Sequence, residues 1–363
     1  MRFIDEFRDA GLTQGLAHRI AGISTKPARL MEFCGGHTVA IMRNGIRQLL
    51  PPSIEMLSGP GCPVCVTANH DIDRAIALSG IPNVTITTFG DMLKVPGSYS
   101  SLQKARAEGG DIRIVYSTQD ALQIARDNPS RSIAFIGIGF ETTAPTIAAS
   151  IVQAEKENLA NFHVLCHLKM TPPAMKALLD LDEIKLNGII CPGHVTAIIG
   201  THPYESYARD YGIACVVAGF EPVDIMQAVE MLVEQIEKGD PRVEIAYTRG
   251  VKPEGNIMAL KLMSGVFDVT SAAWRGIGTI PASGYKIKDK YARFDAEKVF
   301  NIDTPPAKEA PGCRCGEVLR GVVKPPECNL FKIMCVPENP IGPCMVSSEG
   351  TCAAYYQYGD FNE

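Results

Sequence analysis

The sequence of 363 residues lacks the features that would place the protein in a membrane or on a nucleic acid. No segment reaches the roughly 18 uncharged apolar residues of a membrane-spanning helix, and the opening Met1-Arg2-Phe3-Ile4-Asp5 is not the apolar stretch of a signal peptide. Lysine and arginine (35) do not outnumber aspartate and glutamate (40), so the net charge of −5 does not favour anionic partners. We expect a soluble cytoplasmic protein that binds no nucleic acid and no membrane.

The composition is otherwise that of a globular protein, with one exception. Hydrophobic residues make up 46% and charged residues 21%, which excludes wholesale disorder, and the length suffices for two or three domains. The exception is cysteine, of which there are twelve. Because the cytoplasm keeps thiols reduced, such a number favours metal binding or catalysis over structural disulfides.

Short β-branched runs alternate with helical segments over most of the chain, which predicts βαβ units and parallel sheets. We expect two consecutive α/β domains, residues 20–117 and 118–240. Residues 241–363, together with an N-terminal helix over 1–19, should form a smaller, irregular domain that binds an iron–sulfur cluster. The expected strands are 54–57, 84–88, 112–116, 133–138, 163–167, 188–191 and 213–218, and the expected helices 71–78, 102–108, 118–128, 146–158, 173–179 and 223–238.

The expected strands end in loops rich in Gly, Thr, Cys, His and Pro. In open α/β sheets the ligand crevice lies beyond the carboxyl ends of the strands, so these loops should converge. Gly139-Phe140-Glu141 and Gly219-Phe220-Glu221 suggest a duplicated device, in which each glutamate either caps the next helix or binds a ligand. Of the isolated residues, Cys166 and Cys215 are expected to be buried bystanders, His18 and His70 to lie on solvated helices, and Cys191, His167 and His194 to leave a site role open.

Two cysteine-containing loops near the N-terminus predict a reactive thiol site. Cys62 and Cys65 form a C-x2-C motif between a strand and a helix expected to start near Ala68, where the helix dipole stabilises a thiolate. Cys34 is followed by two glycines and His37, before a helix expected near residue 38. Thiolate, imidazole and backbone N–H groups together suit a soft metal or redox chemistry. An incidental C-x2-C is the alternative.

The C-terminal cysteines predict a metal cage. Cys328, Cys335, Cys344 and Cys352 are spaced C-x6-C-x8-C-x7-C in a proline-rich stretch. Four thiolates on irregular backbone suit a [4Fe–4S] cluster, and the paired C-x2-C knuckles usual for structural zinc are absent here. Zinc and free or disulfide-bonded cysteines remain alternatives. Cys313 and Cys315, with one residue between them, are left outside the cage.

Five motifs are specific enough to identify a family. They are Cys34-Gly35-Gly36-His37-Thr38, Gly59-Pro60-Gly61-Cys62-Pro63-Val64-Cys65, Gly139-Phe140-Glu141-Thr142-Thr143, Pro192-Gly193-His194-Val195 and Cys344-Met345-Val346-Ser347-Ser348-Glu349-Gly350-Thr351-Cys352. With these motifs the chain resembles, over essentially its whole length, the HypD family of [NiFe]-hydrogenase maturation factors. Where the family often has a second histidine after Cys-Gly-Gly-His-Thr, this chain has Val39, so His37 is the histidine to favour.

The resemblance implies two α/β domains, a third that holds a [4Fe–4S] cluster, and work with a HypC-like chaperone. Cyanide would come from carbamoyl phosphate through HypF-like and HypE-like proteins, and the iron–dicyanide–carbonyl unit, Fe(CN)2CO, would pass indirectly to the hydrogenase large subunit. Cys34 would match the family's iron-binding cysteine and Cys62 and Cys65 its redox pair. Cys328, Cys335, Cys344 and Cys352 would match the cluster ligands.

We hypothesise that the cluster relays electrons to Cys62 and Cys65, which gate the loading of iron at Cys34, with Glu349 either carrying protons or capping a turn. The protein would then be a scaffold with a redox role. The alternatives are an iron–sulfur-dependent thiol–disulfide reductase, which leaves Cys34 and His37 unexplained, and a structural zinc protein. In the favoured arrangement the two cysteine groups should face each other across a cleft or be joined by a thiol relay.

Overall fold

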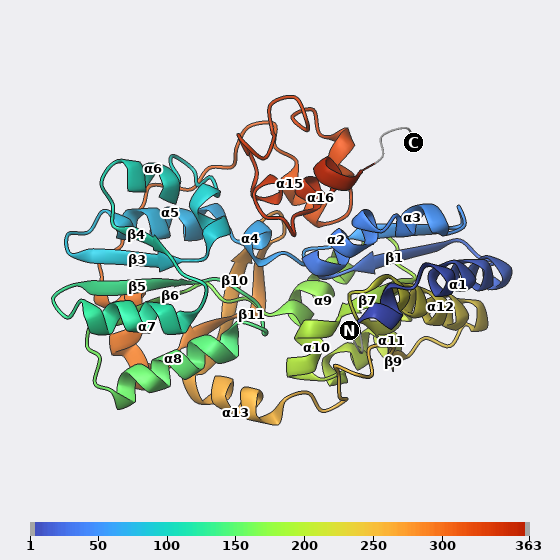
Figure 1. Ribbon diagram of the computed structural model, residues 1–363, viewed down its shortest axis with the longest axis horizontal. Helices are drawn as coiled ribbons and strands as arrows, with labels where there is room; N and C mark the ends of the chain where they lie inside the picture. Colours follow the sequence, from blue (N-terminus) through green and yellow to red (C-terminus); the bar gives the residue numbers. More distant parts are fainter. Residues whose placement is uncertain (1–3, 360–363) are drawn as a thin grey trace.

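The structure, a computed structural model, describes residues 4–359. Its first sheet has five parallel strands in the order β2-β1-β7-β8-β9, on the right of Figure 1. Every residue of β7 and β8 is buried, as expected for parallel strands with helices on both faces of the sheet. The strands are β1 (Ala28–Glu32), β2 (Ile54–Ser58), β7 (Gly188–Pro192), β8 (Ala214–Ala218) and β9 (Val243–Ile245).

Two hydrophobic clusters cover the faces of this sheet. One joins α1 and α12 to the strands through residues such as Ile20 and Val229, and the other includes Met175 of α9 and Tyr207 of α11. The helices of this part are α1 (Ala10–Ile23), α2 (Gly35–Arg43), α3 (Ile46–Leu49), α9 (Thr171–Leu181), α10 (Gly193–Ile199), α11 (Glu205–Tyr211) and α12 (Pro222–Lys238), with the 3-10 turns η1 (Asp5–Arg8) and η3 (His202–Tyr204).

The second sheet has four parallel strands in the order β4-β3-β5-β6. Phe135 and Ile147 belong to the cluster on one face, and Ile72 and Ile136 to the cluster on the other. The elements are β3 (Val84–Thr88), β4 (Ile112–Ile114), β5 (Ser132–Gly137) and β6 (Phe162–Cys166), with α5 (Asn69–Ser79), η2 (Gly90–Lys94), α6 (Leu102–Ala107), α7 (Thr118–Asp127) and α8 (Ala144–Lys156).

The α/β class with two parallel sheets is confirmed, but the sheets do not divide at residue 117. Strand β1 pairs with β7, Leu30 lying opposite Gly188, so the first sheet takes strands from both sides of the second. The chain leaves the first sheet after β2, builds β3 to β6, and returns at β7. Hydrophobic periodicity identifies strands but not their partners, and therefore the predicted domains 20–117 and 118–240 each mix both sheets.

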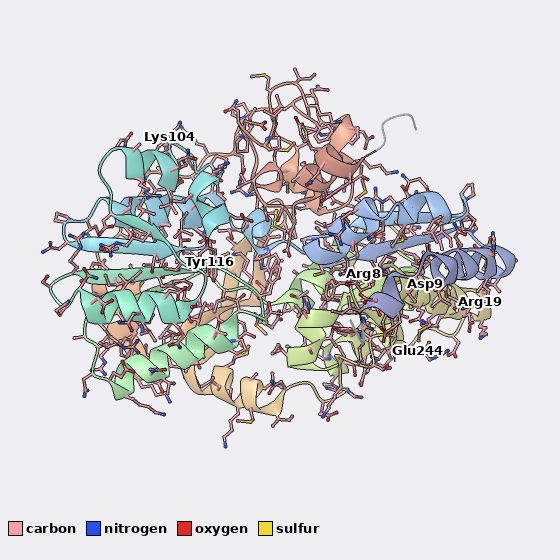
Figure 2. The ribbon with its side chains drawn as sticks, in the orientation of Figure 1. Arg8, Asp9, Arg19, Lys104, Tyr116 and Glu244 are labelled. Carbon is pink, nitrogen blue, oxygen red and sulfur yellow. A yellow bond between two sulfur atoms is a disulfide. The ribbon has the colours of Figure 1, made fainter. Side chains whose placement is uncertain are left out.

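The N-terminal helix also lies elsewhere than predicted. Instead of joining the C-terminal region, α1 packs against α12 of the first sheet. Two ion pairs support the contact, Arg8 Nε to Glu221 Oε2 at 2.6 Å and Arg19 Nε to Glu230 Oε1 at 2.6 Å; Figure 2 labels both arginines. The amphipathic pattern of this helix predicts that one face is buried, but it does not show which element covers that face.

The predicted irregular domain over residues 241–363 is irregular only in its later part, because its first part forms regular elements. Helix α13 and an antiparallel hairpin, β10 with β11, pack on the second sheet. The elements of the C-terminal part are α13 (Ile257–Val266), β10 (Phe267–Trp274), β11 (Gly278–Ile287), η4 (Asp289–Phe294), α14 (Ala296–Val299), α15 (Cys315–Leu319), η5 (Pro325–Glu327), η6 (Pro343–Met345) and α16 (Thr351–Tyr358). Of these, η4 and α14 contact β6 of the second sheet, whereas α15 and α16 lie above and between the two sheets in Figure 1. Over residues 4–359, no helix is both long and apolar enough to cross a membrane.

Candidate thiol and metal centre

The two N-terminal cysteine loops lie side by side because they follow neighbouring parallel strands, β1 and β2. The backbone N–H of Gly35 donates to the carbonyl of Gly61 at 3.0 Å. A Cβ added at Gly61 would lie 2.2 Å from the backbone nitrogen of Cys34, so only glycine permits this approach. The two loops thus meet at the carboxyl edge of the first sheet, and the Cys34 loop follows β1, a strand that was not predicted.

Cys34 caps the N-terminus of α2, one turn earlier than the helix was expected. Its side chain makes no capping hydrogen bond, but the nearby backbone N–H groups of Gly36 and His37 act to lower the pKa of the thiol. Burial, reinforced by the carboxylates of Glu349 and Glu32, nevertheless raises the pKa of Cys34 to about 12. In these surroundings the thiol is favoured, and a cation must replace its proton for the thiolate to act as a ligand.

Glu32, at the end of β1, orients the cysteine loop and was missed from the sequence. Its Oε2 accepts the backbone N–H of Cys34 at 2.8 Å, and its Oε1 accepts the hydroxyl of Thr38. Burial raises the pKa of Glu32 to about 7, because these hydrogen bonds only partly compensate for the loss of water. A carboxylate inside the apolar run 30–33, just before the cysteine, was the available signal.

The predicted histidine lies in the same site, next to a second one. The rings of His37 and His194 both stack on Phe220, with centroid distances of 4.6 and 3.9 Å. His37 Nε2 lies 2.9 Å from the carbonyl of Gly219, whereas its Nδ1 is buried and has no hydrogen-bond partner among residues 4–359. Burial lowers the pKa of His37 to about 4 and also lowers that of His194, so neutral imidazoles are favoured. His194, whose site role was left open, thus lies beside His37 in this site.

The two Gly-Phe-Glu sequences have structural roles at their glutamates. Glu221 pairs with Arg8 and forms a capping box with Asp224 at the start of α12. Glu141 is buried and accepts the backbone N–H and the hydroxyl of Thr171, both at 2.9 Å. The capping alternative thus holds for Glu221, whereas Glu141 does not cap the next helix, α8, but accepts from Thr171 at the start of α9.

Cys62 and Cys65 form a disulfide. Cys62 caps a one-turn helix, α4 (Pro63–Val66), and α5 starts only at Asn69, so the helix start expected near Ala68 belongs to a second helix. Both cysteines are buried. Cys65 Sγ lies 3.8 Å from the carbonyl oxygen of Pro343, the residue before Cys344, which brings the disulfide against the C-terminal cysteine region.

All six C-terminal cysteines line one cavity, including the two that the sequence left outside. Helix α15 begins at Cys315 and turns it inward, so that its Sγ lies 2.8 Å from Cys344 Sγ. The backbone of Gly342 passes Cys313 so closely that an added Cβ would lie 2.7 Å from its sulfur. The cysteines are Cys313, Cys315, Cys328, Cys335, Cys344 and Cys352.

These side chains converge without forming a preassembled coordination site. Within residues 4–359, no three His, Cys, Asp or Glu side chains are arranged so that they could hold a metal ion. Cys313 and Cys315, which the sequence left outside the cage, share its cavity, whereas the ligand set of four stays a prediction. Spacing could not show that α15 folds back on the later loops.

Glu349 lies beside the Cys34 loop. A Cβ added at Gly35 would lie 2.5 Å from Glu349 Cβ, so the loop before α16 touches the first turn of α2. Partial burial and the nearby Asp91 raise the pKa of Glu349. Its chain neighbour Ser347 accepts the backbone N–H of Glu349 at 3.3 Å.

The remaining candidates lie outside this centre. Cys191 and Cys215 are wholly buried in the core of the first sheet. His18 is exposed on α1, and His70, half exposed at the start of α5, pairs with Asp71. Cys166, expected to be buried, is the partly buried last residue of β6 in the second sheet, and His167 follows it.

The fold and site define an α/β protein in which a cysteine loop at a helix N-terminus, a disulfide and a six-cysteine cavity adjoin one another. A family model described as "HypD: Hydrogenase formation hypA family" matches residues 11–359. The chain is 47% identical over 373 residues to hydrogenase maturation factor HypD2 of Bradyrhizobium diazoefficiens, with 100% of this chain and 98% of the relative covered. It is 45% identical to HypD of Cupriavidus necator (100% and 98%) and 43% identical to HypD of Escherichia coli (99% and 98%). The chain therefore belongs to the HypD family.

Proposed function

We propose that the protein acts in hydrogenase maturation as a redox-active scaffold, on which iron receives its cyanide and carbonyl ligands. The single observation that carries this proposal is the contiguity of the three thiol groups. Gly35 is hydrogen-bonded to Gly61, and Cys65 contacts Pro343. A disulfide reductase would need the disulfide and a reducing centre, but it leaves the Cys34 loop without a role, and the relatives are named as maturation factors.

Iron is the cargo of this scaffold, and Cys34 is its proposed protein ligand. Low-spin iron carrying cyanide and carbonyl prefers a soft, strongly donating ligand, which a thiolate supplies. The N–H groups of Gly36 and His37 stabilise the thiolate once iron has replaced its proton. Glu32 orients the Cys34 loop through its hydrogen bond to the backbone N–H of Cys34. The neutral rings of His37 and His194, stacked on Phe220, line the same site.

The disulfide next to this site supplies the redox element. Cys62 and Cys65 hold two electrons and two protons when reduced, and their thiols then become available beside Cys34. Since both residues are buried, reduction changes the packing at the loop as well as its ligand set. We propose this change as the gate for iron loading.

The donor set of the C-terminal cavity fits a [4Fe–4S] cluster, because six thiols line a single space in an irregular segment. Cys328, Cys335, Cys344 and Cys352 would hold it, and the position of Cys315 against Cys344 makes Cys315 a further candidate ligand. Such a cluster, when bound, supplies electrons one at a time.

The partners follow from the role rather than from a described surface. A HypC-like chaperone would share the iron, a HypE-like protein served by a HypF-like one would deliver cyanide, and the hydrogenase large subunit would receive the product indirectly. Location in the cytoplasm stays a prediction.

Infrared spectroscopy of the protein purified anaerobically with its HypC-like partner tests the proposal. We expect cyanide and carbonyl stretching bands in the wild type and their loss in Cys34→Ala and in the double variant Cys62→Ser/Cys65→Ser. The latter should keep the visible absorbance of the cluster. Cys215→Ala, a buried cysteine of the first sheet, is the matched control and should keep the bands. Bands that persist without Cys34 contradict its role as the iron ligand.

A further inference from the structure

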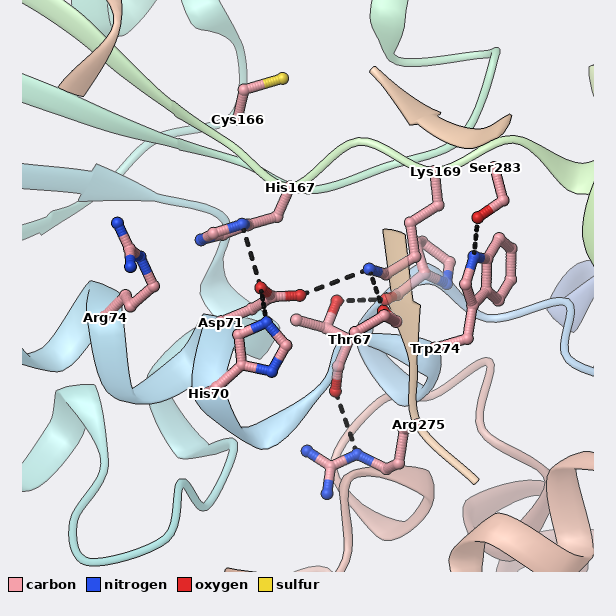
Figure 3. A network of polar contacts seen from close by, with 12 residues as sticks. Thr67, His70, Asp71, Arg74, Cys166, His167, Lys169, Trp274, Arg275 and Ser283 are labelled. Atoms are coloured by element: carbon pink, nitrogen blue, oxygen red, sulfur yellow. Dashed lines mark hydrogen bonds and ion pairs between the residues drawn. The ribbon is translucent and has the colours of Figure 1, made fainter. Parts of the chain in front are cut away.

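A buried arginine holds the disulfide turn, residues 62–67, to the β10–β11 hairpin (Figure 3). Arg275 stands in the turn between β10 and β11, and its side chain is only 4% exposed. Its backbone N–H donates to the carbonyl of Val66 at 2.9 Å, and its Nε donates to the carbonyl of Thr67 at 3.0 Å. Val66 is the last residue of α4, the helix that carries Cys65. The arginine therefore anchors the end of the disulfide turn.

The same turn of the hairpin also contacts the helix that carries Cys315. Gly276, the residue after Arg275, passes α15 so closely that an added Cβ would lie 2.2 Å from Gly316 Cα. Gly316 directly follows Cys315, which lines the six-cysteine cavity. Arg320, at the end of α15, donates to the carbonyl of Gly276. The turn that carries Arg275 is thus fixed between the disulfide turn and the wall of the cavity.

The positive charge of Arg275 is only partly compensated among residues 4–359. Its Nη1 pairs with Glu309 Oε2 at 2.8 Å, but the side chain of Glu309 is 65% exposed, so water screens this carboxylate. The third nitrogen, Nη2, is buried and has no hydrogen-bond partner in this part of the chain. Because a buried charge is costly unless it is paired, the guanidinium favours a further negative charge nearby.

The cysteine cavity is where such a charge can arise. The hydrogen bond with Cys344 lowers the pKa of Cys315, burial opposes this shift, and the charge of Arg275 adds to it, so the guanidinium acts on the cavity electrostatically. Trp274, the neighbour of Arg275, packs in one hydrophobic cluster with Cys65, Cys315 and Cys344. Thiolates that hold an iron–sulfur cluster bring negative charge into the cavity, and one-electron reduction of the cluster adds one more negative charge.

We propose that Arg275 is a positioning residue with two roles. Its hydrogen bonds hold the disulfide turn against the cysteine cavity, and its charge stabilises the extra negative charge of a reduced cluster in that cavity. The electron comes from an external one-electron donor, and Arg275 neither gains nor loses a proton. The inference rests on the cluster and the disulfide of the proposed function, and it adds the residue that lies between them.

The charge role is tested on the full chain, reconstituted anaerobically with iron and sulfide and titrated with dithionite in the presence of redox mediators. Visible absorbance and electron paramagnetic resonance give the ratio of reduced to oxidised cluster. At the potential where the wild type is half reduced, Arg275→Gln should lower this ratio roughly tenfold, because two unit charges about 10–15 Å apart at an effective dielectric constant of about 20 change an equilibrium constant by about that factor.

Two further variants separate the charge from the packing. Arg275→Lys keeps the charge, and Arg320→Gln removes a more exposed guanidinium that contacts the same turn, so both should keep the ratio within about twofold of the wild type. Glu309→Gln should raise the ratio, but by less, because the carboxylate is exposed. A wild-type ratio in Arg275→Gln, or an equal loss in Arg275→Lys, would refute the charge role.

The anchoring role is tested on the oxidised, cluster-free chain, so this test does not depend on the cluster. Reduction of the Cys62–Cys65 disulfide by a water-soluble phosphine is followed by thiol alkylation and mass spectrometry. Reduction should be at least about threefold faster in Arg275→Gln and in Arg275→Lys, because the turn opens more often. Arg126→Gln, which removes a remote arginine of α7 that pairs with Glu157, should keep the wild-type rate.

The two tests distinguish a failure of this inference from a failure of the proposed function. A wild type that assembles no iron–sulfur cluster would contradict the proposed function and the charge role together. Wild-type reduction rates in both Arg275 variants would refute the anchoring role, and they would leave the proposed function unaffected.

Discussion

Replacing Gly61 by alanine tests the contact that joins the two N-terminal thiol loops. The added Cβ would lie 2.2 Å from the nitrogen and 2.4 Å from the Cα of Cys34, and 2.5 Å from the carbonyl carbon of Phe33. All three are backbone atoms, so no side chain can rotate away, and the loops must separate by roughly 0.8 Å to reach even the 3.0 Å limit of real contacts. Overpacking of this kind costs about 1–3 kcal/mol, and the hydrogen bond from Gly35 to Gly61 adds about 1 kcal/mol.

We therefore expect Gly61→Ala to lower the free energy of unfolding by about 2–4 kcal/mol, a large share of the 5–15 kcal/mol typical of a folded protein. Urea unfolding is followed by the fluorescence of Trp274, the only tryptophan, which is buried. Gly15→Ala in α1 is the matched control, since an added Cβ there meets no atom within 4 Å and should stabilise the helix by about 0.5–1 kcal/mol. If Gly61→Ala stays within about 0.5 kcal/mol of the wild type, the close approach of the loops is not as described.

Three further substitutions probe the rest of the centre. The stability that the raised pKa of Glu32 contributes is present below the unfolded pKa of about 4.5 and is lost as pH rises through about 7, so Glu32→Gln should flatten the pH dependence of the unfolding free energy between these values. Phe220→Ala removes two stacked ring pairs and should cost about 1–3 kcal/mol and raise the pKa of both histidines toward ordinary values, which NMR titration measures. Cys315→Ala should lower the iron and sulfide content after anaerobic reconstitution, whereas equal content in Cys315→Ala and Cys166→Ala would place Cys315 outside the ligand set.

Local signals identified most strands of the two parallel sheets, but they missed β1, the strand that precedes Cys34, and β9 to β11, and the pairing of the strands did not follow from them. The run 188–191 is apolar and β-branched, and it forms β7 as predicted. That β7 pairs with β1 rather than with β6 depends on contacts across about 150 residues, which no local periodicity contains. The same limit applies to α1: its apolar stripe predicts a buried face, yet its partner α12 lies about 200 residues away.

The site was predicted where chemistry is carried by short motifs and missed where it depends on packing. Cys34 and the C-x2-C motif can be recognised in the sequence because glycines flank them and helices follow them. The structure places the two loops next to each other. Glu32 has a raised pKa because it is buried at the end of β1. Cys315 reaches the cavity because α15 turns its sulfur toward Cys344. Burial and chain reversal depend on tertiary structure. The sequence alone therefore gives no reason to select these residues as site residues over their neighbours.

The interrupted order of the first sheet also explains where the disulfide lies. After β2 the chain crosses from the first sheet to the second, and Cys62 and Cys65 occupy the start of that crossing, in α4 at the centre of Figure 1. Cys65 there shares a hydrophobic cluster with Phe140 of the second sheet, Trp274 of the hairpin and Cys344 of the C-terminal region. Two consecutive domains would have placed this motif inside one unit. An inserted second sheet instead places it where both sheets, the hairpin and the C-terminal region meet.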